Sequence, residues 1–434
     1  MTIASETETT PWRSTNRRTP ADPPQRTTPA YAGDFGDVFW IALGRMCLTI
    51  LTLGFARFWM ITRMRRYYWS SIRVGGQPLE YTGTALELLV GFLMALVIIA
   101  TYLMVVNLGL AFIGLSVFDN QALALQLPLV ALLPFYVWAQ YRARRYILAR
   151  TRWRGIRFGL APGAWGYVAR FFGWGVLSTI SLGLLYPLMQ FRLSRFVTAR
   201  SYYGDLAFSQ EGRWLKLLTR WLVAWVPMML LLGVLIGLGA LASQFDGDNE
   251  ATVAAPEFRG LIAALILFGL AAYLGLSYYQ IASFRYLNSN VVLAGGVRFT
   301  FSIGFWRIVG IYLLGGLLIS AGVAVVAGVA SIFGAAALFG GLSALGELAA
   351  GKMPGLDTLS SLALLGLLAY LPVVATYSAL SHALITHPTI RAVAMTTEIH
   401  NLAGAGIARQ RDHDEQAEAG GFADALGVDA GGAF

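Results

Sequence analysis

The sequence predicts a mainly α-helical, polytopic membrane protein with about six transmembrane helices, two re-entrant or interfacial helical hairpins and a small layer of short β-hairpins. Three observations predict this fold class. Of the 434 residues, 57% are hydrophobic and only 13% are charged, whereas roughly a quarter of an average soluble domain is charged. Long apolar segments alternate with short arginine clusters. Glycine recurs at a nearly fixed distance after four of these clusters, as in tight β-turns.

Both ends of the chain are expected to be disordered. Residues 1–32 are rich in Thr, Pro and Arg, and no apolar segment of the kind found in signal peptides occurs before Phe39. Residues 401–434 consist mainly of Ala, Gly and acidic side chains. Such compositions bury too little apolar surface to offset the entropy that is lost on ordering.

Six apolar segments are long enough to cross a membrane, because roughly 20 helical residues span about 30 Å of hydrocarbon. None of the six contains Asp, Glu, Lys or Arg, and one of them contains His382. The expected spans are residues 88–118, 122–141, 221–245, 260–284, 308–346 and 358–384. An even number of crossings puts both termini on one side of the membrane, and the arginine clusters predict that this side is the cytoplasm.

Two further apolar segments, residues 35–60 and 164–189, are expected to re-enter the membrane or to lie in its interface. Arginines flank each segment on both sides, so one crossing would place a strongly basic flank outside, against the positive-inside rule. Each segment has a glycine at which it can fold back, in Leu53-Gly54 and in Leu182-Gly183. If both segments crossed instead, the protein would have eight spans.

The chain is expected to be a tandem duplication. Leu53-Gly54 lies 129 residues before Leu182-Gly183, and Arg66-Tyr67 lies at the same offset before Arg195-Phe196. The predicted organisation is a first repeat half in residues 33–160, a second half of the same plan in residues 161–302, and a diverged helical hairpin in residues 303–400, between the two disordered ends.

A shorter unit recurs four times and predicts four β-hairpins. Each copy starts with an arginine followed by an aromatic residue and reaches a glycine between short alternating segments. The turns are expected at Gly75-Gly76, Gly155, Gly204-Asp205 and Gly295-Gly296. Because an isolated hairpin is marginally stable in water, we expect the four to pack into one cytoplasmic sheet or barrel-like layer. The alternative is that they are irregular loops whose arginines reach lipid phosphates.

The first copy resembles the YjgN family of bacterial inner-membrane proteins. The resemblance rests on Leu48-Thr49-Ile50-Leu51-Thr52-Leu53-Gly54, on Arg65-Arg66-Tyr67-Tyr68, and on the segment that begins with Gly75-Gly76-Gln77-Pro78. It covers residues 34–305 well and continues loosely to residue 400. The family is a domain of unknown function, so the resemblance implies a location in the bacterial cytoplasmic membrane and no activity or ligand.

The arginine clusters are the candidate functional residues. Arginine forms two-pronged hydrogen bonds to phosphate, and aromatic rings beside it favour the membrane interface. We therefore expect contacts with anionic lipid headgroups, or with another anion, at Arg63, Arg65, Arg66, Arg142, Arg144, Arg145, Arg192, Arg195 and Arg285. The alternative is that these residues only set the topology.

No catalytic, cofactor-binding or metal site is expected. The single cysteine, Cys47, excludes an intrachain disulfide and a cysteine-built metal site. His382 and His387 are five residues apart, which places them on different faces of an α-helix and suits a shared metal poorly. The net charge of +9 comes from arginines beside apolar segments, which favours a membrane surface over nucleic acid.

Three classes of function follow. The favoured class is a non-enzymatic membrane scaffold or lipid-interacting protein, whose hairpin layer is also expected to offer a surface to a protein partner. The alternative is a transporter or channel for a small solute, for which internal duplication is typical but for which charged groups at the midplane are lacking. A membrane enzyme is disfavoured, because no converging histidines and carboxylates are found.

Overall fold

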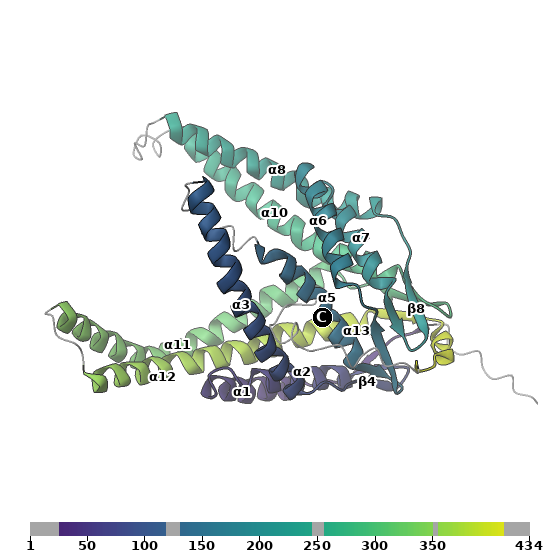
Figure 1. Cartoon of the computed structure of the whole chain (residues 1–434), viewed down its shortest axis with the longest axis horizontal. Coiled ribbons are helices and arrows are strands. Elements are labelled where there is room, and N and C mark those ends of the chain that lie inside the picture. The colour runs from purple at the N-terminus through teal and green to yellow at the C-terminus, as the bar shows by residue number, and fades with distance from the viewer. Residues whose placement is uncertain (1–25, 119–130, 245–255, 350–354, 412–434) are drawn as a thin grey trace, which may run out of the picture.

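The computed structural model describes residues 26–118, 131–244, 256–349 and 355–411. In these residues the chain repeats one plan five times: a strand, a pair of helices, and a second strand that pairs antiparallel with the first. Figure 1 shows the strands gathered at one end of the molecule, with the helix pairs extending from them.

The first and third units have short helix pairs. The first comprises β2 (Ala30–Tyr31), α1 (Phe35–Leu51), α2 (Arg57–Ser71) and β3 (Ile72–Val74). The third comprises β6 (Ile156–Leu160), α6 (Ala164–Ile180), α7 (Tyr186–Thr198) and β7 (Ser201–Tyr203). Each pair folds back at the expected dipeptide, where Leu53 and Leu182 have φ of 51° and the glycine after each also has a positive φ.

The second, fourth and fifth units have long helices. The second comprises β4 (Gln77–Tyr81), α3 (Ala85–Phe118), α5 (Leu133–Arg150) and β5 (Thr151–Trp153). The fourth comprises β8 (Leu206–Gln210), α8 (Leu215–Gln244), α10 (Pro256–Ser289) and β9 (Val291–Leu293). The fifth comprises β10 (Val297–Phe301), α11 (Phe305–Ala349), α12 (Leu356–Ser381), a π-helical turn (His382–Thr386), α13 (His387–Met395) and β11 (Thr397–His400).

Hairpins between consecutive units join all the strands into one sheet, in the order β1-β11-β10-β9-β8-β7-β6-β5-β4-β3-β2. The two ends of this order, β1 (Arg26–Thr27) and β2, are separated by only two residues in the chain. Since two residues span only a few ångströms, the sheet closes on itself. Residues 26–31 therefore form a clasp: β1 pairs with β11 of the last unit and β2 pairs with β3 of the first.

The same backbone hydrogen bond fixes the base of every unit. In each, the residue after the first strand donates its amide to the carbonyl oxygen at the end of the second helix, over 2.8 to 3.1 Å. The five bonds run from Ala32 to Ser71, Thr82 to Arg150, Ala161 to Arg200, Glu211 to Asn290, and Ser302 to Thr396. The five units are therefore equivalent where the helices meet the sheet.

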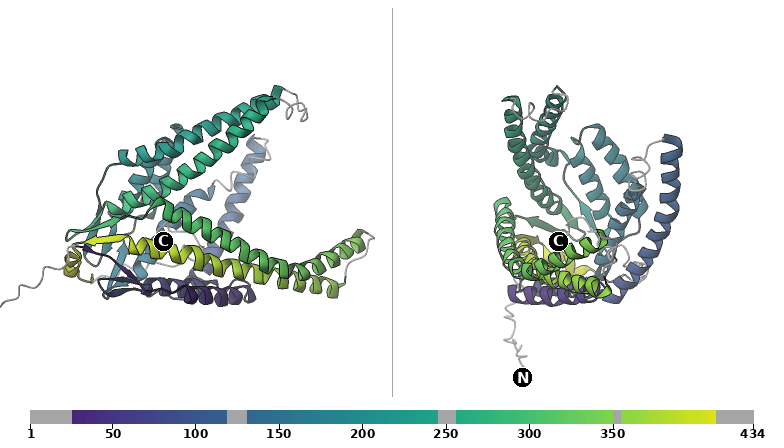
Figure 2. Two further views of the ribbon diagram at one scale, coloured as in Figure 1. Left: turned by 180° about the vertical axis from the view of Figure 1, so that it is seen from behind. Right: turned by 90° about the vertical axis from the view of Figure 1, so that its left-hand side faces the viewer.

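Five helices in the described residues are long and apolar enough to cross a membrane: residues 85–110, 215–241, 258–289, 305–331 and 364–395. Their outward faces are apolar and exposed; Leu313 and Leu317 of α11, for example, are 70% and 67% exposed. This pattern is expected where lipid covers the helix. Most of the expected span at residues 122–141 precedes α5, and residues 119–130 lie outside the described part of the chain. In Figure 2 the helix pairs splay apart with distance from the sheet.

One face of the sheet buries an apolar core to which several hairpins contribute, including Trp153, Tyr203, Leu293, Val297 and Ile399. The chain after β11 completes this core: a short 3₁₀ helix (Leu402–Ile407) buries Ala405 among these residues, and Ala408 follows it there.

The segment of residues 401–411, which we call the C-terminal cap, crosses the hairpin tips. The Asn401 side chain donates to the carbonyl oxygen of Gly295 at 3.1 Å, and the Arg409 amide donates to the Asp205 carboxylate at 2.8 Å. The expectation of disorder is therefore wrong for part of each end of the chain: residues 26–31 lie in the sheet and residues 401–411 lie on it.

Candidate functional site

An arginine occupies one equivalent position in every unit, five residues before the carbonyl that closes the base. We call the set the base arginines: Arg66, Arg145, Arg195, Arg285 and Arg391. The sequence predicts the first four. It does not predict Arg391, because the fifth unit lacks the glycine turn by which the other copies are aligned. Once the end of the last helix is known, Arg391 is identified by its position five residues before Thr396.

In the first and fourth units the residue after the base arginine is a tyrosine that anchors the second helix to the loop that follows the first strand. The Tyr67 hydroxyl accepts the Asp34 amide at 2.7 Å and donates to the Asp34 carbonyl oxygen at 3.1 Å. Tyr286 repeats both bonds with Arg213, at 2.8 and 3.1 Å. These paired bonds hold the base arginines of the first and fourth units at one height above the sheet.

The second unit uses an ionic version of this anchor. The Tyr146 hydroxyl donates to the Glu87 carboxylate at 2.9 Å, and Arg150 forms an ion pair with the same carboxylate at 3.0 Å. Burial, together with the nearby Tyr81 and Glu87, raises the pKa of Tyr146 well above its ordinary value, so the phenol remains a donor. Glu87 is thus held by two residues of α5.

Four base arginines are exposed and one is buried. Arg66, Arg195, Arg285 and Arg391 are exposed, whereas Arg145 is only 6% exposed. Arg66 donates to the carbonyl oxygen of Gly83 at 2.8 Å, which ties the first unit to the loop between β4 and α3 of the second. The exposed guanidinium groups lie where the apolar helices end and the polar sheet begins.

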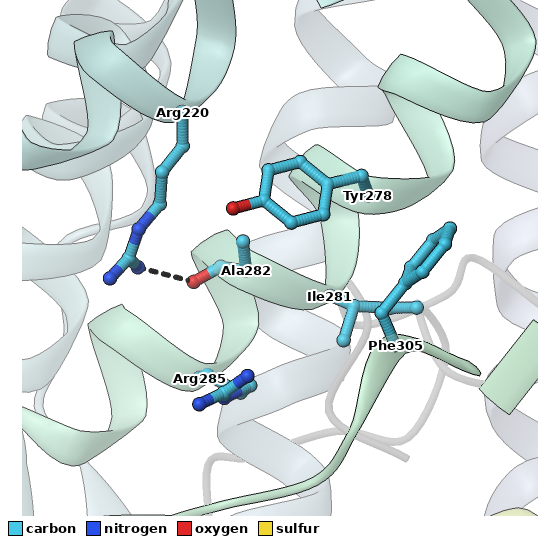
Figure 3. Close-up of a pocket in the computed structure, with 6 residues that line it drawn as sticks. All are labelled: Arg220, Tyr278, Ile281, Ala282, Arg285 and Phe305. Atoms are coloured by element: carbon cyan, nitrogen blue, oxygen red, sulfur yellow. Dashed lines mark hydrogen bonds between the residues drawn. The ribbon is translucent and has the colours of Figure 1, made fainter. Parts of the chain in front are cut away.

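Two cavities each contain an exposed base arginine. The first, of about 380 Å³, lies between α2 and β4 and includes Arg63, Arg66 and Glu80 in its lining. The second, of about 210 Å³, lies between the fourth and fifth units and includes Arg220 and Arg285. Figure 3 shows the guanidinium groups of Arg220 and Arg285 on the same side of this second cavity.

In the second cavity Arg220 is held in place by its neighbours. It donates to the carbonyl oxygen of Ala282 at 2.8 Å, and its guanidinium carbon lies 5.0 Å from the ring centroid of Tyr286. Arg285 is the equivalent of Arg66, and Phe305 at the start of α11 lines the same cavity. Arg220 did not enter the expected set, since it lies alone at the entrance of a span.

The remaining predicted arginines lie against aromatic side chains. The Arg65 guanidinium donates to the Tyr81 hydroxyl at 3.2 Å. Arg142 and Arg192 lie over the rings of Trp138 and Trp174, at 5.2 and 5.4 Å from the ring centroids. Such cation–π contacts fix the guanidinium plane at the interface.

Arg144 is partly buried near Tyr167, and burial lowers the pKa of its guanidinium. The predicted residues are therefore spread over several units. Among the exposed ones, Arg63 and Arg66 line one cavity and Arg285 lines another, so they do not converge on a single point.

Comparison with known proteins places this arrangement in a family. The family described as "Bacterial protein of unknown function (DUF898)" matches residues 26–321. The chain belongs to this family. The match begins at β1 and ends within α11, so in this DUF898 protein it covers the clasp, four complete units and the start of the fifth.

A curated relative of the DUF898 protein is the "Inner membrane protein YjgN" of Salmonella typhimurium. The two are 26% identical over 144 residues, which is 32% of this chain and 34% of the relative, so the match spans about a third of that protein. The expected resemblance to the YjgN family is confirmed. No solved structure matches the chain.

The fifth unit of the DUF898 protein contains a buried histidine, His387, whose position relative to His382 differs from the expected one. The turn between α12 and α13 is a π-helix, in which the His387 amide bonds to the His382 carbonyl oxygen. A π-helix turns less per residue than an α-helix, so the argument that five residues separate two faces does not hold here. His387 is 5% exposed and lies against Tyr31 of the clasp, with ring centroids 5.3 Å apart.

The His387 contact holds the clasp against the last unit, and its ring nitrogens have no hydrogen-bond partner among the described residues. Among all the residues that the structure describes, no three His, Cys, Asp or Glu side chains are grouped so that they could hold a metal ion.

Proposed function

We propose that this protein is a multi-pass scaffold of the bacterial inner membrane that binds phospholipid headgroups through its exposed base arginines. The observation that carries the proposal is their common height: Arg66, Arg195, Arg285 and Arg391 occupy equivalent positions where lipid-facing helices meet the sheet. Lipid phosphates lie at this level of a bilayer. Arginine binds phosphate with charge-assisted, two-pronged hydrogen bonds.

The charge distribution supports a cytoplasmic position for the sheet. The hairpins carry Arg73, Arg152, Arg154 and Arg157. At the far ends of the long helices, residues 246–257 of the fourth unit contain four acidic side chains and no Lys or Arg, and residues 347–357 of the fifth contain Glu347, Asp357 and Lys352. By the positive-inside rule the sheet and both termini face the cytoplasm, and the base arginines meet the anionic inner leaflet. There each basic residue contributes about 1 kcal/mol to membrane attraction.

The short helix pairs support a re-entrant placement. Each helix of 17 residues, α1 or α6, is about 25 Å long at 1.5 Å per residue, which is short of a full crossing. Leu53 and Leu182 at the two turns are 90% and 64% exposed. An apolar turn of this kind is stable in lipid only if its backbone polar groups are satisfied within the protein.

The turns meet this requirement in part through side chains. The Thr52 hydroxyl accepts the Ala56 amide at 2.9 Å, and the Ser181 hydroxyl accepts the Leu185 amide at 3.1 Å. In the third unit, Trp221 of α8 also donates to the carbonyl oxygen of Gly183 at 3.0 Å. Polar groups that water would otherwise satisfy are thus satisfied by the protein, which favours immersion of the turn.

The test is the loss of lipid when the exposed base arginines are neutralised. We expect the variant with Arg66, Arg195, Arg285 and Arg391 changed to glutamine to retain much less phospholipid after purification in detergent. It should also bind vesicles containing phosphatidylglycerol several-fold more weakly than the wild type. Arg154→Gln on the sheet, where the arginine lies over Trp153 at 4.4 Å, is the control and should bind normally. Unchanged lipid content in the fourfold variant would refute the proposal.

A further inference from the structure

The groove between α2 and β4 holds charges of both signs. Arg63, Arg66, Tyr67 and Ser70 of α2 line it, and so does Glu80 of β4, which is paired in register with Arg152 of β5. In the part of the chain that the structure describes, none of the three charged side chains forms an ion pair within 4.0 Å. Two guanidinium groups and one carboxylate therefore line a cavity of about 380 Å³ without neutralising one another.

This separation restricts the ligands that the groove can take. A simple anion would bind the two arginines but would be repelled by Glu80, and a simple cation would meet the opposite difficulty. A ligand that carries a negative and a positive group, a short distance apart, satisfies both sides. Each contact is then a charge-assisted hydrogen bond, roughly twice as strong as a neutral one.

Glu80 is specific to this groove. It is the next-to-last residue of β4, and the equivalent residues of the later units are Gly159, Ser209 and Thr300. The cavity that contains Arg220 and Arg285 has no acidic side chain in its lining. Of these two cavities, the α2–β4 groove therefore has mixed charge, whereas the one with Arg220 and Arg285 is purely basic.

We infer that the α2–β4 groove binds a phosphoethanolamine headgroup, which extends the proposed function by naming the lipid class of this site. The phosphate diester accepts hydrogen bonds from Arg63 and Arg66, whereas the Ser70 hydroxyl already donates to the Tyr67 carbonyl oxygen at 3.0 Å. The primary ammonium, two carbons away, donates to Glu80. The Tyr67 hydroxyl is engaged with Asp34 and serves as a wall rather than as a ligand.

The chemistry separates this headgroup from two others that carry the same phosphate. Phosphatidylglycerol has no cation for Glu80, so it gains no contact with this carboxylate. Phosphatidylcholine has a cation with no N–H to donate, so it gains only an unspecific attraction. The order of affinity expected for the groove is phosphatidylethanolamine first, with the other two weaker.

The experiment uses the full-length protein in detergent and measures bound lipid by native mass spectrometry. Dioleoyl phosphatidylethanolamine, phosphatidylglycerol and phosphatidylcholine are added in separate titrations. Glu80→Gln should weaken phosphatidylethanolamine binding about tenfold, since the hydrogen bond from the ammonium loses the charge of its acceptor, and should leave phosphatidylglycerol binding equal or stronger. Arg63→Gln with Arg66→Gln should weaken all three lipids. Glu211→Gln, which removes a carboxylate 3.5 Å from Arg298 on the sheet, is the matched control.

The outcomes distinguish the two proposals. If Glu80→Gln leaves the ratio of phosphatidylethanolamine to phosphatidylglycerol unchanged while the arginine variants lose lipid, the headgroup assignment is wrong and the base arginines remain lipid ligands. If the wild type retains none of the three lipids, both proposals fail.

Competition by soluble phosphoethanolamine at the same Glu80-dependent site would show that the free headgroup suffices for binding. Retention of lipid in its presence would show that the acyl chains contribute. Melting temperatures of the variants within about 2 °C of the wild type exclude misfolding as the cause.

Discussion

The indole Nε1 of Trp225 donates a hydrogen bond to the carbonyl oxygen of Leu182 at 3.0 Å. This bond joins a span of the fourth unit to the tip of the short helix pair of the third. Trp221, one helical turn earlier in α8, donates to the carbonyl oxygen of Gly183. Two tryptophans on one face of α8 therefore provide hydrogen bonds to two carbonyl oxygens of the turn. A turn in water would not need this arrangement, because water would bond the same oxygens.

The depth of this turn can be measured by cysteine labelling, since Cys47 is the only native cysteine. In a Cys47→Ala background, we expect Leu182→Cys to resist maleimides added from either side until detergent is present, because the reactive thiolate does not form in hydrocarbon. Gln77→Cys, on the exposed start of β4, should react with an impermeant maleimide in inverted vesicles. Labelling of Leu182→Cys from the periplasmic side would contradict the re-entrant placement and favour a full crossing.

A buried tyrosine in the sheet predicts a loss of stability in alkali. The Tyr203 hydroxyl donates to the carbonyl oxygen of Trp153 at 3.0 Å, and burial raises the pKa of this phenol to about 12. In the unfolded chain the pKa is about 10. The folded state therefore keeps a proton that the unfolded state loses, so this contribution is complete below pH 10 and disappears as the pH rises to 12.

The measurement is thermal unfolding followed by tryptophan fluorescence between pH 9 and pH 12. Tyr203→Phe should cost about 1 kcal/mol at neutral pH, because one buried hydrogen bond is lost. Its melting temperature should fall less steeply than that of the wild type above pH 10. Tyr202→Phe on the adjacent residue should follow the wild type. Parallel pH profiles for the wild type and Tyr203→Phe would show that this phenol does not contribute.

The parts of the fold that sequence can predict are those with a local signal. Leu53-Gly54 marks a turn because the glycine that follows an apolar segment adopts a positive φ. The arginine clusters beside apolar segments mark the helix ends. The closure of the sheet has no such signal: β1 has two residues, and Arg26 pairs with His400 across nearly the whole chain. Pairing over that distance is determined by tertiary packing.

The candidate site shows the same division. Arg66, Arg195 and Arg285 are recognisable from sequence because each precedes an aromatic residue and a turn glycine. Arg391 precedes Ala392, and its unit ends in a strand that pairs with the clasp instead of in a glycine turn. Glu80 is isolated in the sequence, and it joins Arg63 and Arg66 only because β4 folds back beside α2. A groove made by two elements leaves no pattern in either one.

Close packing of α8 and α10 predicts opposite effects for two glycine substitutions in one helix. A Cβ atom at Gly275 would lie 2.7 Å from the Ala224 Cα and from the Val223 carbonyl oxygen, whereas one at Gly269 would meet nothing within 4 Å. Gly275→Ala should therefore separate the helices and lower the melting temperature. Gly269→Ala should leave it unchanged or raise it, because alanine favours a helix by up to about 1 kcal/mol over glycine. Equal effects of the two changes would mean that this contact does not stabilise the pair.

The C-terminal cap predicts a change in protease sensitivity. Ala405 is 4% exposed in the apolar core of the sheet, whereas the adjacent Gly406 is exposed, and a Cβ atom there would meet nothing within 4 Å. Ala405→Glu places an unpaired charge in the core, at a cost of roughly 3 kcal/mol, and should release the cap. Gly406→Glu adds the same charge to the surface and should leave the cap in place.

Trypsin reports the position of the cap, because Arg409 and Arg411 are cleavage sites within it. In the wild type the Arg409 amide bonds to Asp205, and the Arg411 guanidinium lies 3.9 Å from the ring centroid of Tyr202, so both sites are held against the sheet. We expect Ala405→Glu to be cleaved at these arginines at least tenfold faster than the wild type, and Gly406→Glu to be cleaved at the wild-type rate. A protease needs an extended, detached segment, so rapid cleavage of the wild type would mean that the cap is not bound in solution, and the apolar core beneath it would then be open to water.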